Sequence, residues 1–210
     1  MTKLMGMDMF ATGNSYGERV PLARIAKRVL DLLIAGTALV MFSPLLAFIC
    51  IGIKLEGRSQ AVLVRQRAVF TGGEFAIYKF ATTASQRGFR RVTRVGALLQ
   101  NTSMDELPQL LNVLNGDMSL VGPRPHAVAM KAGGQLYHDA VAEYAQRHKV
   151  KPGITGWAQV NGLRGEIDST EKAQQRVIYD LKYIDEWSLW FDIVILLASL
   201  PIVLKRENAY

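Results

Sequence analysis

The chain contains little of what disulfide frameworks and cysteine or histidine metal sites require. Its 210 residues include one cysteine, Cys50, so neither an intrachain disulfide nor a cysteine metal cage can form. Three histidines are scattered without the spacing of metal ligands, and we expect them to be ordinary helix or loop residues: His126, His138 and His148. The sequence also has no internal repeat and no low-complexity tract. Function must therefore be sought in other residue types.

Acidic residues are fewer than basic ones. The chain has 25 Lys and Arg against 18 Asp and Glu, a net charge of +7 and a pI near 9.6. Such an excess predicts an anionic partner, which could be nucleic acid, an acidic membrane surface or a phosphorylated substrate. A mildly basic soluble domain is the plain alternative. We expect no nucleic-acid partner, because no recognisable reading helix is present and the basic residues flank an apolar segment.

That apolar segment runs from residue 29 to residue 53, and its only charged residue is Asp31. At about 1.5 Å rise per residue, a helix of roughly 25 residues could cross a bilayer core of about 30 Å. The segment begins too far from the N-terminus for a signal peptide and lacks a small-residue cleavage site. We therefore expect the protein to be membrane-bound.

Ser43 and Pro44 lie near the middle of this segment, where proline removes a helical hydrogen bond and clashes with the preceding turn. Basic residues flank both ends: Arg24, Lys27 and Arg28 before it, Lys54 and Arg58 after it. The positive-inside rule then places both ends in the cytoplasm. We favour a re-entrant helix–break–helix over a kinked spanning helix, which stays the alternative.

The fold class that these patterns predict is α+β and mostly helical. We expect a flexible N-terminal tail over 1–23, a re-entrant membrane helix over 24–56, a cytoplasmic domain over 57–186 and an interfacial C-terminal helix over 187–210. The domain should contain a short β-hairpin turning at Thr71-Gly72-Gly73, followed by a polar, arginine-rich link. Trp187, Trp190 and Phe191 suit a C-terminal helix at the lipid headgroups, with core packing as the alternative.

Two adjacent acids, Asp105 and Glu106, stand before the run "LPQLLNVLNGDMSLVGPRPH". If a helix begins near Asp105, Thr102 or Ser103 can cap it, and Glu106 completes a capping box with Ser103. This structural interpretation competes with a catalytic one.

Several blocks, in this order and spacing, resemble the bacterial sugar transferase family, the monotopic polyprenyl-phosphate hexose-1-phosphate transferases. The resemblance runs from about Arg24 to Lys205, and it rests on the blocks "KRVLDLL", "FSPLL", "RQRAVFTGGEFAIYKF", "SMDELPQLLNVLNGDMSLVGPRPH", "RHKVKPGITGWAQVNGLRGE" and "DLKYIDEWSLWFDI".

The resemblance implies an enzyme of the bacterial inner membrane with its catalytic domain on the cytoplasmic face. Such enzymes transfer a sugar 1-phosphate from a UDP-sugar to undecaprenyl phosphate, release UMP and initiate exopolysaccharide or other surface glycans. The chain is similar to the minimal form of the family, and most similar to its glucose-1-phosphate branch; galactose or an N-acetylated sugar stays open. Expected partners are the UDP-sugar, undecaprenyl phosphate and inner-membrane lipids, and a homodimer is compatible with the family.

The resemblance also implies roles for individual residues. Asp105 would be the nucleophile that forms a covalent phosphosugar intermediate, and Glu106 would bind Mg²⁺. Arg124, in a turn stiffened by two prolines, would bind a phosphate through its guanidinium fork. Weaker phosphate candidates, each of which could be a solvated surface charge, are Lys79, Arg91, Arg94, Lys151 and Arg164. Polar contacts to the sugar or uridine would come from Gln159, Asn161 and Glu166.

The sequence departs from the family pattern at three basic positions. Ala81 stands where the family commonly has arginine, Gln100 and Asn101 stand where two basic residues are common, and the link from Phe80 to Arg91 is short. A catalytically impaired scaffold or regulator of a polysaccharide synthesis complex is therefore the alternative function.

Overall fold

The computed structural model describes residues 21–56, 61–70, 73–86, 89–126, 130–165 and 167–205. The predicted N-terminal tail lies almost entirely outside these residues. The helical elements that pack around the centre are α1 (Pro21–Leu55), α2 (Arg94–Thr102), α3 (Gln109–Asn115), α5 (Trp157–Val160), α6 (Thr170–Glu186) and α7 (Leu189–Lys205). Apolar helices and a small amount of strand give the mostly helical α+β architecture that the sequence predicts.

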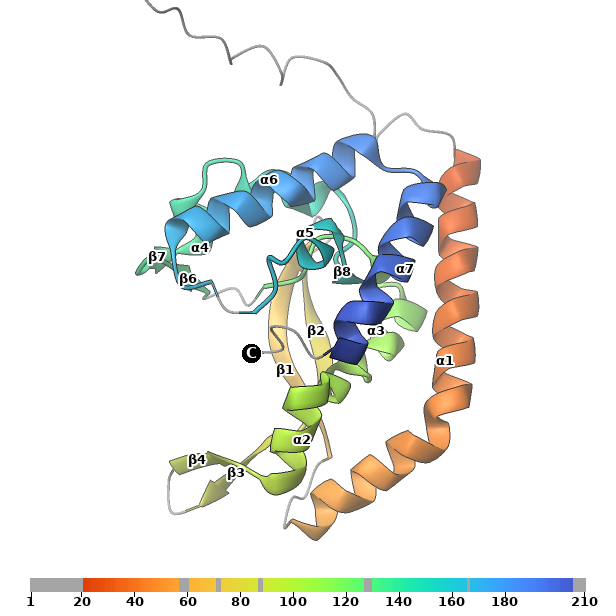
Figure 1. The fold of residues 1–210 in the computed structure, drawn as a ribbon, viewed down its shortest axis with the longest axis vertical. Helices are drawn as coiled ribbons and strands as arrows, with labels where there is room; N and C mark the ends of the chain where they lie inside the picture. The colour runs from red at the N-terminus through yellow and green to blue at the C-terminus, as the bar shows by residue number, and fades with distance from the viewer. Residues whose placement is uncertain are drawn as a thin grey trace, which may run out of the picture.

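Helix α1 runs the length of one side of the molecule and bends in its second half (Figure 1). Helical structure continues through Pro44, so the expected break is a bend in a continuous helix. Proline explains the bend because it has no amide hydrogen and its ring clashes with the turn before it. Beside it, the Ser43 hydroxyl donates to the Val40 carbonyl at 2.8 Å. By length and composition α1 could cross a membrane, and only 11% of its most apolar window is buried.

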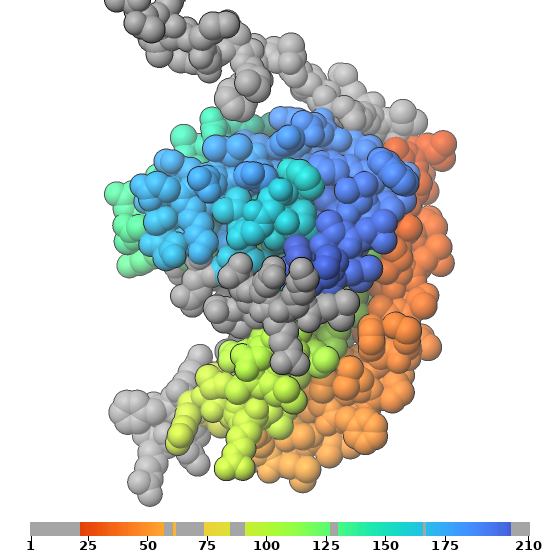
Figure 2. All heavy atoms as spheres, in the orientation of Figure 1, coloured from red at the N-terminus to blue at the C-terminus, as the bar shows by residue number. Residues whose placement is uncertain are grey.

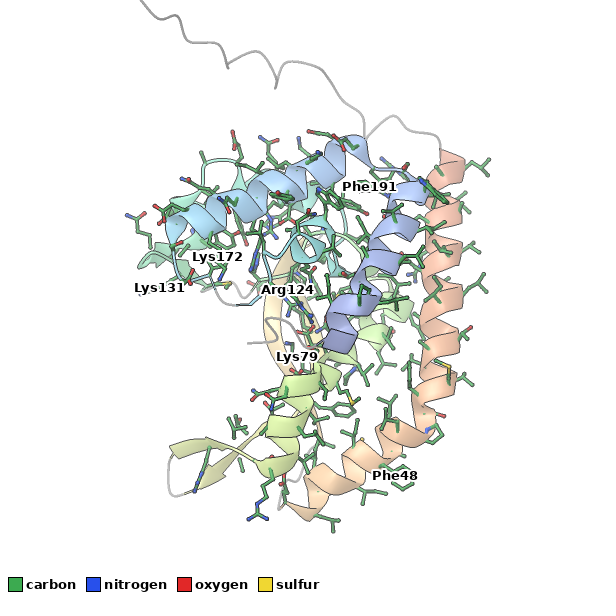
Figure 3. The ribbon with its side chains drawn as sticks, in the orientation of Figure 1. Phe48, Lys79, Arg124, Lys131, Lys172 and Phe191 are labelled. Atoms are coloured by element: carbon green, nitrogen blue, oxygen red, sulfur yellow. The ribbon has the colours of Figure 1, made fainter. Side chains whose placement is uncertain are left out.

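Both arms of α1 pack against the rest of the chain. The first arm lies beside α3 and α7, and the second lies beside α2 (Figure 2). A core cluster that includes Ala35, Val113 and Ile195 joins the first arm to α3 and α7. Ile53 and Leu99 belong to a second cluster, between the later arm and α2. The outward face of α1 stays exposed, as for Phe48, which is 72% exposed and points away from the domain (Figure 3).

Antiparallel strands β1 (Val62–Phe70) and β2 (Gly73–Phe80) form a hairpin in the middle of the molecule, with an irregular register between Val64 and Gln66. The polar link expected after Phe80 is instead a second hairpin, of β3 (Thr83–Gln86) and β4 (Phe89–Val92). Its short strands lack the apolar alternation by which a strand is recognised from sequence.

Strands β5 (Ser119–Val121) and β8 (Gly153–Thr155) pair in parallel. The Gly122 amide donates to the Thr155 carbonyl at 2.9 Å, and the Gly153 amide donates to the Pro123 carbonyl at 3.0 Å. A Cβ on Gly153 would lie 2.1 Å from the Gly122 nitrogen. Only glycine allows two backbones this close, so the "PGITG" segment holds the turn that carries Arg124.

Smaller elements complete the end of the domain farthest from α1 (Figure 1). They are β6 (Lys131–Ala132), β7 (Gln135–Leu136) and α4 (Tyr137–Ala140), and the 3-10 helix η2 (Tyr144–Lys149) runs from them toward the start of α1. A third cluster packs them on α6 through Tyr137, Ala173 and Val177.

The aromatic residues at the start of α7 do not all face outward as expected. Trp187 is 3% exposed and its indole donates to Asp192 at 3.2 Å. Phe191 packs edge-on against Trp157 with 5.0 Å between ring centroids. Trp190, by contrast, is 70% exposed. Core packing, the alternative interpretation, therefore holds for Trp187 and Phe191.

Candidate active site

The two acids lie in a short 3-10 helix, η1 (Met104–Glu106), between α2 and α3. Thr102 is the last residue of α2, and Ser103 has a left-handed backbone with φ 56°. Ser103 makes no side-chain cap hydrogen bond to η1, so the predicted capping box is wrong. The left-handed turn instead returns the Ser103 amide to the Gln100 carbonyl at 3.1 Å. Asp105 and Glu106 are nevertheless buried, at 4% and 7% exposure.

Two cations hold the Glu106 carboxylate. The Lys79 ammonium lies 2.7 Å from Glu106 Oε1 and 3.7 Å from Asp105 Oδ2. The Arg124 guanidinium donates to both Glu106 oxygens, to Oε2 at 3.2 Å. Burial alone would raise the pKa of Glu106, but the charges of Arg124 and Lys79 outweigh burial and lower this pKa to about 2. Glu106 is therefore an anion across the physiological range.

Lys79 is fixed by a contact from α3. Asn112 is fully buried, and its side chain accepts from the Tyr78 amide at 3.0 Å and donates to the Ala76 carbonyl at 2.7 Å. This amide bridge joins α3 to β2 at the residue before Lys79. The strand therefore presents Lys79 to the acids at a fixed position.

Arg124 is fixed by a buried polar network behind its turn. Arg147 donates from Nε to Asp180 at 2.7 Å, and from Nη2 to the Arg124 carbonyl at 2.9 Å. Its Nη1 lies 2.8 Å from Nδ1 of His126. Burial and the guanidinium groups of Arg147 and Arg176 hold the pKa of His126 well below its usual value. The imidazole is therefore neutral, and Nδ1 can accept the arginine hydrogen.

The same network reaches a second arginine of the site. Arg176 lies 3.2 Å from Nε2 of His126, and it donates to the Gly165 carbonyl at 3.0 Å. The neighbouring Arg164 donates to the Ser103 hydroxyl at 3.1 Å, next to the acid pair. Arg124 and Arg164 are thus anchored to one buried cluster. Figure 3 shows Arg124 and Lys79 near each other at the centre of the molecule.

A mostly apolar cavity of about 270 Å³ opens at Glu106. Gln159 and Arg164 line it beside the acid, Ala38 and Phe42 line it from α1, and Ile202 lines it from α7. The cavity therefore connects the charged centre to the two apolar helices.

Three predicted phosphate contacts lie elsewhere. Arg91 and Arg94 are exposed, the first on β4 and the second at the start of α2 beside Glu56. Lys151 lines a different cavity, together with Arg28. Among the described residues, none of the three predicted cations contacts the acid pair.

The other predicted positions have mixed outcomes. Gln159 is buried at the cavity and donates to the Ile154 carbonyl at 3.0 Å. Asn161 is exposed and donates to the Trp157 carbonyl at 2.7 Å. Glu166 lies outside the described residues. Ala81, where the family commonly has arginine, is 1% exposed and packs in the core beside α2.

Sequence reasoning missed the residues that position the site. The pairing of Arg147 with Asp180, and the place of His126 between two arginines, join segments far apart in the chain. The one available signal was the position of Asp180 three residues after Val177 and four before Ile184, which places a carboxylate on the apolar face of its helix.

The donor atoms at the acid pair suit a hard cation. Within the part of the chain that the structure describes, no group of three or more His, Cys, Asp or Glu side chains could enclose a metal ion. Mg²⁺ typically uses one or two carboxylates and completes its shell with water and substrate phosphates. The adjacent carboxylates of Asp105 and Glu106 fit that chemistry, although Lys79 and Arg124 already pair with Glu106.

Residues 22–206 match the model of a protein family described as bacterial sugar transferase. The chain is 46% identical over 204 residues to a UDP-glucose:undecaprenyl-phosphate glucose-1-phosphate transferase of Caulobacter vibrioides, covering 90% of this chain and 75% of that protein. It is 44% identical over 197 residues to the Escherichia coli protein of the same name, covering 89% and 42%. It is 42% identical over 207 residues to an undecaprenyl-phosphate glucose phosphotransferase of Komagataeibacter xylinus, covering 92% and 39%. The chain thus spans less than half the length of two of these relatives.

Proposed function

Because the chain belongs to the bacterial sugar transferase family, we propose that it transfers a hexose 1-phosphate from a UDP-sugar to undecaprenyl phosphate and releases UMP. Glucose 1-phosphate is the proposed group, since the relatives above carry that sugar in their names. One observation carries the proposal: a buried carboxylate pair stands between Lys79 and Arg124 and opens on an apolar cavity. The product would begin a surface polysaccharide.

The proposed reaction has two displacements at one phosphorus. A carboxylate oxygen of Asp105 attacks the sugar-bearing phosphorus, and UMP leaves with the bridging oxygen. A phosphate oxygen of undecaprenyl phosphate then attacks the same phosphorus. This step releases the Asp105 carboxylate and yields the undecaprenyl diphosphate sugar. Since both substrates and the nucleophile are anionic, the reaction depends on positioned cations.

Lys79 and Arg124 support this chemistry because both are held from behind. Each cation is mostly buried, with 20% and 24% of its side chain exposed. Positioned before the substrate arrives, they need little reorganisation when charge develops on the transferred phosphoryl group. Glu106, already ionised, together with the substrate diphosphate would hold Mg²⁺. Bound there, Mg²⁺ would neutralise diphosphate charge as the Asp105 carboxylate approaches.

The apolar cavity supports an isoprenoid substrate. It joins Glu106 to Phe42 of α1 and Ile202 of α7, both on helices with exposed apolar faces. An isoprenoid chain could lie along these residues while its phosphate reaches the acids. A water-soluble acceptor would gain no binding energy from this apolar lining.

A re-entrant topology is supported by contacts at both ends of α1. Near its start, Arg28 donates to the Val113 and Leu114 carbonyls at 2.6 and 2.8 Å. At its end, the Val95 amide donates to Glu56 at 3.1 Å. One domain thus holds both ends, whereas a simple spanning helix would place them on opposite faces of the bilayer. We propose that both ends and the domain lie on the cytoplasmic face of the inner membrane.

The deciding experiment measures UMP release by the purified protein with UDP-glucose, Mg²⁺ and undecaprenyl phosphate. We expect release, and a mass increase of one hexose phosphate on the wild-type protein before the acceptor is added. Asp105→Asn keeps the shape but lacks an anionic nucleophile, so its turnover should fall by several orders of magnitude and its mass should not change. Normal turnover in Asp105→Asn would refute the covalent role. Absence of UMP release with every common UDP-sugar would favour the scaffold function.

A further inference from the structure

A second cavity lies at the start of α1, apart from the acid pair. Its volume is about 400 Å³, and its charged lining residues are Arg24, Lys27, Arg28, Asp31, Lys149 and Lys151. The first four belong to α1, and the lysines come from the end of η2 and the segment that leads into β8. Neither Asp105 nor Glu106 lines it.

Positive charge in this cavity is only partly neutralised. Lys27 pairs with Asp192 at 2.7 Å, so its charge is neutralised. Arg28 donates to neutral backbone carbonyls, and Lys149 lies 3.5 Å from the neutral amide oxygen of Gln146. Asp31 is buried and accepts from the Leu120 amide at 3.1 Å. Cations therefore outnumber carboxylates around the hollow.

Lys151 is the cavity cation with the fewest polar contacts. Among the described residues, its ammonium has neither a hydrogen bond nor an ion pair within contact distance. Burial and the charge of Arg28 lower the pKa of Lys151, while Asp31 and Asp117 act in the opposite direction. Cations gathered around a hollow repel one another, so an anion in that hollow would stabilise the arrangement.

The cavity borders an exposed apolar surface. Leu22, Ile25 and Val29 on the first turns of α1 are 70%, 59% and 48% exposed. They occupy the helix face beside the one that carries Arg24 and Arg28, as the period of 3.6 residues requires. A ligand with an anionic head and apolar chains would match both surfaces together.

We propose that this cavity binds the phosphate headgroup of an anionic phospholipid, whose acyl chains lie along the exposed face of α1. Basic side chains near a bilayer surface attract anionic lipids, by about 1 kcal/mol each, which is about fivefold in affinity per cation. The bound lipid would fix the first arm of α1 at headgroup depth. The proposal rests on membrane association and is independent of the transfer reaction.

The test titrates the detergent-solubilised full chain with short-chain phosphatidylglycerol and counts bound lipid by native mass spectrometry. Short-chain phosphatidylcholine and inorganic phosphate are titrated in parallel. Arg24→Gln combined with Lys151→Gln removes two cations from the cavity. The matched control, Lys131→Gln with Lys172→Gln, removes two from the end of the molecule away from α1 (Figure 3). Melting temperatures without lipid establish that each variant is folded, and Lys151→Gln alone serves if the double variant is not.

We expect wild type and the control to bind phosphatidylglycerol more tightly than phosphatidylcholine, and the cavity variant to bind it about 25-fold more weakly. The single variant should show about a fivefold loss. Equal losses in the control and cavity variants would overturn the proposal. So would equal affinity for the two lipids, or saturation by inorganic phosphate that phosphatidylglycerol cannot displace, which would assign the cavity to a free anion.

Discussion

Replacing Asp180 by asparagine should lower the stability of the protein substantially. Asp180 and Arg147 are paired at 2.7 Å, and each side chain is only 2% exposed. Asparagine keeps the shape and can still accept a hydrogen bond, but it leaves the guanidinium charge buried without a counter-charge. Breaking a buried pair in this way costs about 3–5 kcal/mol, and the retained hydrogen bond favours the lower end. At about 2–4 °C per kcal/mol for a chain of this size, the Tm should fall by about 6–12 °C.

Transfer should be impaired as well, because Arg147 also donates to the Arg124 carbonyl. If the turn relaxes, the guanidinium that faces Glu106 moves with it, and a displacement of about 1 Å can cost about 100-fold in rate. Turnover is measured about 15 °C below the lower of the two Tm values, so that wild type and variant are both folded during the assay. The loss should fall mainly on kcat, since we propose that Arg124 acts on the transferring phosphoryl group.

Asp168→Asn is the matched control for this substitution. Asp168 pairs with Lys172 at 3.6 Å, but 74% of its side chain is exposed, and exposed pairs contribute about 0–1 kcal/mol. If Asp180→Asn lowers the Tm no more than Asp168→Asn does, the buried pair is not a major source of stability. A large Tm loss with wild-type kcat in the folded variant would show that the network stabilises the domain without positioning Arg124.

Three further predictions concern the metal, the imidazole and the bend. Glu106→Gln should raise the Mg²⁺ concentration needed for half-maximal turnover, because an amide is a poor ligand for a hard cation; an unchanged Mg²⁺ titration would place the metal elsewhere. Since the pKa of His126 is lowered in the folded state, the unfolded chain binds its proton at higher pH, and stability should decrease as the pH falls below about 6.5. Melting curves from pH 7.5 to 5.5 should therefore show a shallower decrease in His126→Gln but an unchanged one in His138→Gln. Pro44→Ala makes a straight helix about 3 kcal/mol easier to form, so cysteine labelling before Arg24 and after Lys54 should report a mixed topology in the variant and a uniform one in wild type; periplasmic labelling of the wild-type N-terminal positions would contradict the re-entrant proposal.

Local sequence patterns predicted the features that depend on local physics. The apolar run predicted α1, and Pro44 marked the place where α1 bends, although a break was expected there; the Thr71-Gly72-Gly73 signal agreed with the strand pairing around it. The acid pair was also singled out from the sequence, but the predicted capping box was wrong. The left-handed backbone of Ser103 ends α2, and Ser103 makes no side-chain cap hydrogen bond to η1. A serine with positive φ is uncommon, and sequence alone gives no sign of it.

Pairings between distant segments could not be predicted. Nothing near Asp180 in the chain indicates that its partner is Arg147, and nothing near Lys79 indicates that Asn112 fixes its strand. Lys151 is a further case: its position beside the Gly-rich block suggested a substrate contact, and the parallel pairing of β5 with β8 places it in a cavity at the start of α1. Such contacts are decided by tertiary packing, to which a single sequence gives little access.

Hydropathy alone also misrepresents how α1 and α7 meet their surroundings. Each helix carries a buried charge near its start, and those charges pair with each other as Lys27 and Asp192. The Asp192 carboxylate further accepts from the Tyr183 hydroxyl at 2.8 Å. A lipid-surrounded helix would have to bury these groups in hydrocarbon at a cost of several kcal/mol; here the domain satisfies them on one face of each helix. The opposite faces are then mostly apolar, with Phe48 and Trp190 exposed. This division supports two helices that pack on the domain by one face and contact lipid by the other, an arrangement that suits the proposed reaction between a soluble nucleotide sugar and a membrane lipid.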